Sequence, residues 1–273
     1  MALGTLAITY FNWRGRFIPA SPRKVHLAHE FLAGTQYAEH RSVTARIIRK
    51  MELGEDLTPH LSRGVEEVYT PHSERTSRSG GRRDLDRLMA DWAIHHLHLS
   101  LHMETHGFVT RSDDLLFGHF AGQDAYLIGI FPHGSWTLID IAQIAVRNWP
   151  QAGIFHELKG SIRLEQPISD DERPLLRNAG LSSLLEIDGR VYAPAGQSTA
   201  GTPIAAARES NKLMHALRTA RELLHTEGKE VVRLAGGNLG TRTPAWAAVQ
   251  EGDLFAIRET NTGVLVWQVQ FHD

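Results

Sequence analysis

The stretch "DLLFGHFAGQDAYLIGIF", residues 114–131, carries the strongest fold signal in this chain. Two runs of apolar residues flank Gly122-Gln123, and a two-residue connection that contains glycine is typical of a tight turn between antiparallel strands. Runs of this length, rich in leucine, isoleucine and aromatic residues, suit strands better than helices. We therefore predict a β-hairpin over 114–131, and with it an antiparallel sheet.

Helical patterns lie on both sides of this hairpin. "LDRLMADW" (85–92) predicts a short helix, residues 133–150 predict an amphipathic helix, and residues 201–228 carry the clearest helical pattern in the chain. The expected fold class is α+β: an antiparallel sheet with packed helices, a basic helical N-terminal segment and a mixed α/β C-terminal region.

The N-terminal part of the chain is basic. Residues 1–83 hold 13 lysines and arginines against 8 acidic residues, although the whole chain has a formal net charge of -2. The local patterns predict a strand or short hairpin at 8–18, a helix at 21–34 and a helix over about 40–53. A basic segment of this kind favours a nucleic-acid partner.

Three regions are expected: a basic N-terminal segment with a linker at 1–84, a central sheet-helix unit at 85–150, and a C-terminal α+β region at 151–273. The tract 72–84 is polar and rich in serine, glycine and arginine, which is typical of a flexible linker. The C-terminal region could pack with the central unit as one domain.

Composition limits the classes of function. The sequence has no cysteine, which excludes disulfides and thiolate catalysis and is compatible with the cytoplasm. No apolar run approaches the roughly 18 residues needed to cross a bilayer, and the first residues lack the pattern of a secretion signal. We expect a cytoplasmic protein with no membrane partner; the sequence leaves the oligomeric state open.

Histidines cluster in "WAIHHLHLSLH", residues 92–102. The alternation of apolar and polar residues predicts a half-buried strand with polar side chains on one face, among them His96, His98 and His102. Alternate side chains on a strand lie about 6–7 Å apart, so these imidazoles could converge on a metal or on a substrate. Histidines that only pack or form hydrogen bonds are the alternative interpretation.

A metal site is one functional interpretation of this cluster. His96 and His98, two positions apart on a strand, could bind zinc or iron, with Glu104 as a carboxylate ligand. Such a site would indicate a metal-dependent hydrolase or oxygenase.

The same face could act without a metal or another cofactor. Cleavage of RNA through a 2′,3′-cyclic phosphate needs a base for the 2′-OH, an acid for the leaving oxygen and a cation for the developing charge. Histidine titrates near neutral pH and can serve as base or acid. The candidate catalytic residues are His96, His98, His102, His133, Arg111 and Ser135. His133 and Ser135 precede a predicted helix start, where backbone amides favour an anion.

The order of elements over residues 85–149 resembles a known family. A helix, a strand, "DLLFGHF", a turn, "AYLIGIF", a polar turn and an amphipathic helix follow one another as in the core of RelE/HigB-type toxins. Those proteins are metal-independent ribonucleases that cleave mRNA, so the resemblance implies an RNA substrate and an inhibitory protein partner, an antitoxin. Two features depart from the family: Pro132-His133 replaces the usual lysine pair, and the chain is far longer.

We therefore expect a ribonuclease-like toxin or RNA-processing enzyme that uses histidine acid/base chemistry. One alternative is the metal-dependent enzyme. The other is a non-enzymatic module that binds nucleic acid or regulates a partner through the arginine-rich segments 41–50 and 75–87.

Overall fold

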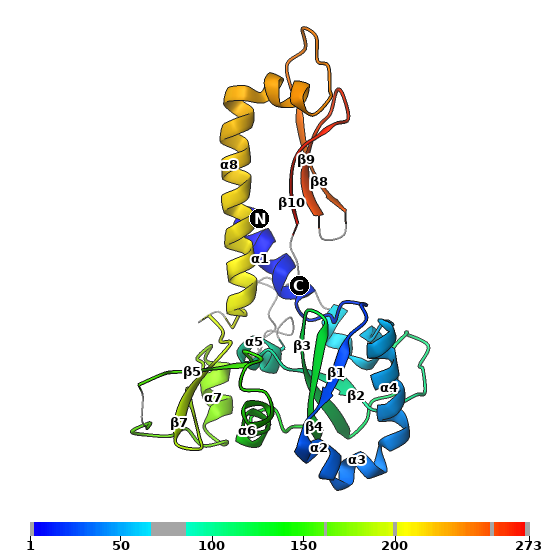
Figure 1. Ribbon diagram of the computed structural model, residues 1–273, viewed down its shortest axis with the longest axis vertical. Helices are drawn as coiled ribbons and strands as arrows, with labels where there is room; N and C mark the ends of the chain where they lie inside the picture. Colours follow the sequence, from blue (N-terminus) through cyan, green and yellow to red (C-terminus); the bar gives the residue numbers. More distant parts are fainter. Residues whose placement is uncertain (1–2, 67–85, 161–162, 199–200, 252–253, 271–273) are drawn as a thin grey trace, which may run out of the picture. The chain divides into compact units, whose positions relative to one another are not determined.

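The chain forms two compact units, one of Thr9–Ala206 and one of Met1–Ile8 with Ala207–Asp273. The computed structural model describes residues 3–66, 86–160, 163–198, 201–251 and 254–270 (Figure 1). The predicted linker at 72–84 lies outside these residues. The combination of helices with mainly antiparallel sheets confirms the α+β class. No described helix is long and apolar enough to cross a membrane.

A four-stranded sheet, in the order β1-β4-β3-β2, lies at the centre of the larger unit. The predicted hairpin is confirmed, because β3 (Asp114–Ala121) pairs antiparallel with β4 (Asp124–Pro132). Its turn contains Gly122 at φ +53°, a left-handed conformation that glycine adopts without strain. β2 (His95–His98) pairs antiparallel with β3 at one edge of the sheet.

Two predictions for the N-terminal segment are wrong. Residues 24–27, predicted as part of a helix, form strand β1 (Lys24–Leu27), which pairs parallel with β4. Residues 8–18, predicted as a strand or hairpin, lie mostly in helix α1 (Leu3–Arg14). Local preference is a weak guide here, because the hydrogen bonds of β1 come from a strand far along the chain.

Helices cover both faces of the central sheet (Figure 1). The predicted helix at 40–53 is confirmed as α4 (Arg41–Leu53), which ends at Gly54 with φ +72°. On the other face lies α6 (Ile139–Asn148). The short helices α2 and α3 precede α4 and span His29–Ala33 and Thr35–Glu39. Because both faces are covered, consecutive residues of β3 are fully buried, namely Leu115, Leu116 and Phe117.

A second sheet completes the larger unit. It is antiparallel, in the order β5-β7-β6, with bounds Phe155–Glu157, Arg190–Pro194 and Leu185–Ile187. The turn between β6 and β7 is Asp188-Gly189, both at positive φ, as is typical of Asp-Gly hairpins. Short helical segments position the candidate site: η1 (Thr58–His60), η2 (Arg63–Glu66), α5 (Arg87–Trp92) and α7 (Arg173–Asn178).

The smaller unit holds most of a long helix and a three-stranded antiparallel sheet. The helix α8 (Ile204–Leu234) confirms the predicted one but continues past Gly228, with a non-helical residue at Glu227. The sheet has the order β10-β9-β8, with bounds Leu265–Gln270, Leu254–Glu259 and Trp246–Glu251.

A buried carboxylate organises the turn between β9 and β10. Glu259 is fully buried, and its oxygens accept hydrogen bonds from the backbone N–H groups of Ala245 (2.9 Å) and Thr262 (2.7 Å) and from the Asn261 amide (2.8 Å). Burial alone would raise the pKa of Glu259, but these hydrogen bonds outweigh it and lower the pKa to about 2. The ionised carboxylate therefore stabilises this turn.

Candidate functional site

The histidines occupy a strand that is shorter than predicted. β2 covers only His95–His98, because α5 ends just before it and Ala93 turns the chain with φ +55°. Side chains alternate along a strand, so His96 and His98 lie on the same face, as predicted. His102 lies beyond the strand and is exposed. The structure thus separates His102 from the other two imidazoles.

His98 is held as a neutral hydrogen-bond donor. Its side chain is buried, and its Nδ1 accepts the backbone N–H of Ser112 at 3.2 Å. Burial, followed by the neighbouring His96 and Arg111, lowers the pKa of His98 to about 4. A neutral imidazole whose Nδ1 accepts carries its proton on Nε2. His98 is therefore suited to donate from Nε2 and not to act as a base.

His96 differs from His98 because its Nδ1 has no hydrogen-bond partner among the described residues. Its buried Nδ1 lies 3.6 Å from Oδ2 of Asp86, near enough for an electrostatic interaction but too far for a hydrogen bond. Burial lowers the pKa of His96, and the Asp86 charge opposes this shift. At neutral pH the ring is thus uncharged and lies beside a carboxylate, which suits a general base.

An indole links His96 to a second histidine of the predicted set. The ring centroid of Trp136 lies 4.6 Å from that of His96 and 5.0 Å from that of His133. His133 is exposed, and its backbone N–H donates to the carbonyl of Asp113. A positive charge on His133 lowers the pKa of both His96 and His98. The three imidazoles therefore form one electrostatic group.

His96 lines a pocket of about 350 Å³. Three arginines and one carboxylate contribute charge to its walls, so the pocket favours an anion. Arg177 and Arg16 are buried in the wall, and Asp86 supplies the carboxylate. The described lining residues are Arg16, Ser62, Gly64, Val65, Asp86, Arg87, Leu88, His96, Trp136, Thr137, Pro174, Arg177 and Asn178.

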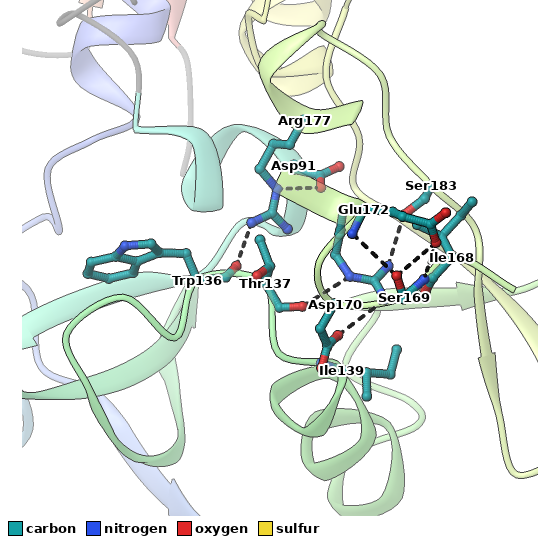
Figure 2. A network of polar contacts seen from close by, with 11 residues as sticks. Asp91, Trp136, Thr137, Ile139, Ile168, Ser169, Asp170, Glu172, Arg177 and Ser183 are labelled. Carbon is teal, nitrogen blue, oxygen red and sulfur yellow. Dashed lines mark hydrogen bonds and ion pairs between the residues drawn. The ribbon is translucent and has the colours of Figure 1, made fainter. Parts of the chain in front are cut away.

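A buried ion pair fixes the arginine of α7 in this wall (Figure 2). Nε of Arg177 donates to Oδ2 of Asp91 at 2.8 Å, with 3% and 1% of the two side chains exposed. Nη1 of Arg177 donates to the carbonyl of Trp136 at 2.5 Å, and the guanidinium lies 4.7 Å from the Trp92 ring centroid. Arg177 thereby connects α7 and α5 to the segment that carries Trp136.

Arg173, one turn earlier on α7, reinforces the same wall. Its guanidinium donates to the carbonyls of Thr137 and Ile168, both at 3.0 Å, and to the hydroxyl of Ser183 at 2.9 Å. Oδ1 of Asp170 lies 3.5 Å from Nη2 of Arg173. Two buried arginines thus face two carboxylates, one buried and one partly exposed, so these four charges balance one another.

The remaining predicted catalytic residues lie around this centre. Arg111 is exposed, and its charge lowers the pKa of both His96 and His98, so it is close to them. The backbone N–H of Ser135 donates to the carbonyl of Pro132, and Ser135 is not among the described residues that line the pocket.

The predicted metal ligands do not gather. Glu104 accepts hydrogen bonds from Arg63 at 2.7 Å and from His106 at 2.5 Å, and Nδ1 of His98 already accepts a backbone N–H. Among the described residues, a different set has potential metal-ligand atoms within 4.8 Å of one another. It consists of Glu39, His40 and Asp114. In that group His40 and Asp114 form a hydrogen bond of 2.9 Å.

Four charged residues that line the pocket were not among the predicted site residues: Arg16, Asp86, Arg87 and Arg177. Asp86 had a local signal, because it is the N-cap of α5 and its Oδ1 accepts the backbone N–H of Met89 at 3.0 Å. Arg177 had none, because its partner Asp91 is 86 residues away.

Comparisons with protein-family models, with curated proteins and with solved structures return no match.

Proposed function

We propose that this chain is a ribonuclease-like enzyme that cleaves RNA by histidine acid/base chemistry, without a metal, in the pocket lined by His96. One observation carries the proposal: an uncharged histidine, with a carboxylate 3.6 Å from its Nδ1, lines a pocket whose other charged residues are three arginines. Attack of a 2′-OH on the adjacent phosphorus requires a base for the hydroxyl proton and a surface that binds the phosphate anion.

The chemistry can be written for the residues of this site. Nε2 of His96 takes the proton of a 2′-OH, and that oxygen attacks the adjacent phosphorus. The bond from phosphorus to the 5′-oxygen breaks and leaves a 2′,3′-cyclic phosphate. The leaving 5′-oxygen takes a proton from an acid, a role that we assign to the exposed His133 beside Trp136. The guanidinium of Arg87 and those of the buried arginines stabilise the added negative charge.

The direct test is cleavage of an RNA oligomer in the presence of EDTA, with analysis of the product ends. We expect 2′,3′-cyclic phosphate ends, and a loss of about 100-fold or more in rate for His96→Ala. His156→Ala is the matched control, because His156 is exposed on β5 and does not line the pocket. Cleavage that appears only after zinc or iron is added would instead support the metal-dependent alternative.

Growth of a host that expresses the chain separates the enzymatic proposals from the binding module. A toxin of the RelE/HigB type should arrest growth, and His96→Ala should relieve the arrest. Arrest would also justify a search for an inhibitory protein partner. A wild-type chain that neither cleaves RNA nor arrests growth would leave the nucleic-acid-binding or regulatory module as the better interpretation.

A further inference from the structure

A second pocket adjoins the one lined by His96. It has a volume of about 470 Å³ and shares two lining residues, Ser62 and Gly64, with the first. Its other described lining residues are Leu61, Arg63, His98, Phe108, Val109 and Arg111, none of which is acidic. A ligand that passes over the segment 62–64 can therefore occupy both pockets.

A buried donor lines this second pocket. Only 3% of His98 is exposed, and its Nδ1 is occupied by the N–H of Ser112, so the proton is on Nε2. No hydrogen bond joins this Nε2 to a described residue, and the atom is not among the fully buried ones that lack a partner, so a ligand in the pocket can reach it. An accessible N–H donor in a pocket can form a hydrogen bond with a ligand oxygen. An oxygen-rich ligand would satisfy it.

Two arginines give the second pocket its charge. Arg63 is paired with Glu104 at 2.7 Å, with about half of its side chain exposed. Arg111 is exposed, and its charge reaches both His96 and His98, one in each pocket. The charge of Arg111 thus acts on the boundary between the two pockets.

We infer that the second pocket binds the neighbouring phosphate of the same RNA strand, so that the substrate is an oligonucleotide and not a single nucleotide. His98 donates from Nε2 to a phosphate oxygen, and Arg111 supplies the charge. This inference rests on the proposed function, because it assumes that the first pocket holds one nucleotide of a strand.

The test measures binding without cleavage. The probe is a fluorescein-labelled hexamer of 2′-O-methyl uridine, which lacks the attacking hydroxyl, and uridine 3′-monophosphate is the competitor for the first pocket. We expect wild type to bind the hexamer at least about tenfold more tightly than the mononucleotide. Arg111→Gln should weaken hexamer binding about tenfold and reduce the salt slope by about 0.7, and it should weaken mononucleotide binding by less.

A second variant tests the direct contact. His98→Asn can keep the acceptor for the N–H of Ser112 while it removes the Nε2 donor. We expect it to weaken hexamer binding but not mononucleotide binding, with an unchanged circular dichroism spectrum. Arg49→Gln is the control for loss of a charge, because Arg49 lies on α4, pairs with Glu52 and lines neither pocket.

The results distinguish this inference from the proposed function. If the wild type cleaves RNA but Arg111→Gln and His98→Asn bind the hexamer as tightly as the wild type, the second subsite is overturned and the proposed function stands. The second subsite is also overturned if the wild type cleaves RNA but binds the hexamer no more tightly than the mononucleotide. If the wild type neither binds the hexamer nor cleaves RNA, both are overturned.

Discussion

Replacement of Arg177 by methionine should destabilise the larger unit strongly. The change leaves the carboxylate of Asp91 buried, with 1% exposed, and without its one ion-pair partner among the described residues. An uncompensated charge of this kind typically costs about 3–5 kcal/mol. The carbonyl of Trp136 also loses its donor. For a unit of this size, that loss lowers the midpoint of thermal unfolding by roughly 6–20 °C.

The assay is thermal and urea unfolding of the full chain, followed by tryptophan fluorescence. Hydrogen exchange in α5 and α7 locates the change in the larger unit, because the two units can unfold separately. Arg190→Met is the matched control. Arg190 forms an exposed pair with Glu157 at 3.3 Å, and such pairs contribute about 0–1 kcal/mol.

The double variant Asp91→Leu/Arg177→Met separates loss of the charge pair from loss of packing. With both charges removed, no buried charge remains uncompensated, and we expect the double variant to recover at least about 2 kcal/mol relative to Arg177→Met. The reasoning is refuted if Arg177→Met costs less than about 1 kcal/mol, or if the double variant is no more stable than the single one.

Three further predictions concern other parts of the chain. Asp86→Asn should slow RNA cleavage and move the acid limb of the pH–rate profile to lower pH, because the Asp86 charge raises the pKa of His96; an acid limb at higher pH would contradict this. The Glu259 carboxylate has a folded pKa of about 2, below its usual 4.5, so its contribution to stability is present above pH 4.5 and is lost as the pH falls toward 2. In the Glu259→Gln variant, the free energy of unfolding should not show this loss between pH 4.5 and 2, which acid unfolding measures. Gly54→Ala should cost more stability than Gly107→Ala. Both have positive φ, which costs about 1–2 kcal/mol for alanine, but only at Gly54 would the new Cβ lie 2.5 Å from neighbouring backbone; equal urea midpoints would contradict this.

Local patterns predicted the elements whose stability is largely local. The hairpin over 114–131 depends on a short glycine-containing turn between adjacent strands, and α4 carries an apolar stripe and a glycine stop within its own residues. The placement of His96 and His98 on one face also follows from the alternation of side chains along a strand. The pattern misled at residues 24–27, where pairing with β4 decides the conformation.

The amino-acid sequence by itself determined the α+β class, the central hairpin and the residue types that could perform acid/base chemistry. Only the tertiary structure decided what those residues can do. It places His96 beside Asp86, holds His98 as a neutral donor through Ser112, and brings Arg177 to the pocket through its contact with Asp91. The physical reason is that protonation states and pockets depend on burial and on charges contributed by distant segments, and neither is encoded in the spacing of neighbouring residues.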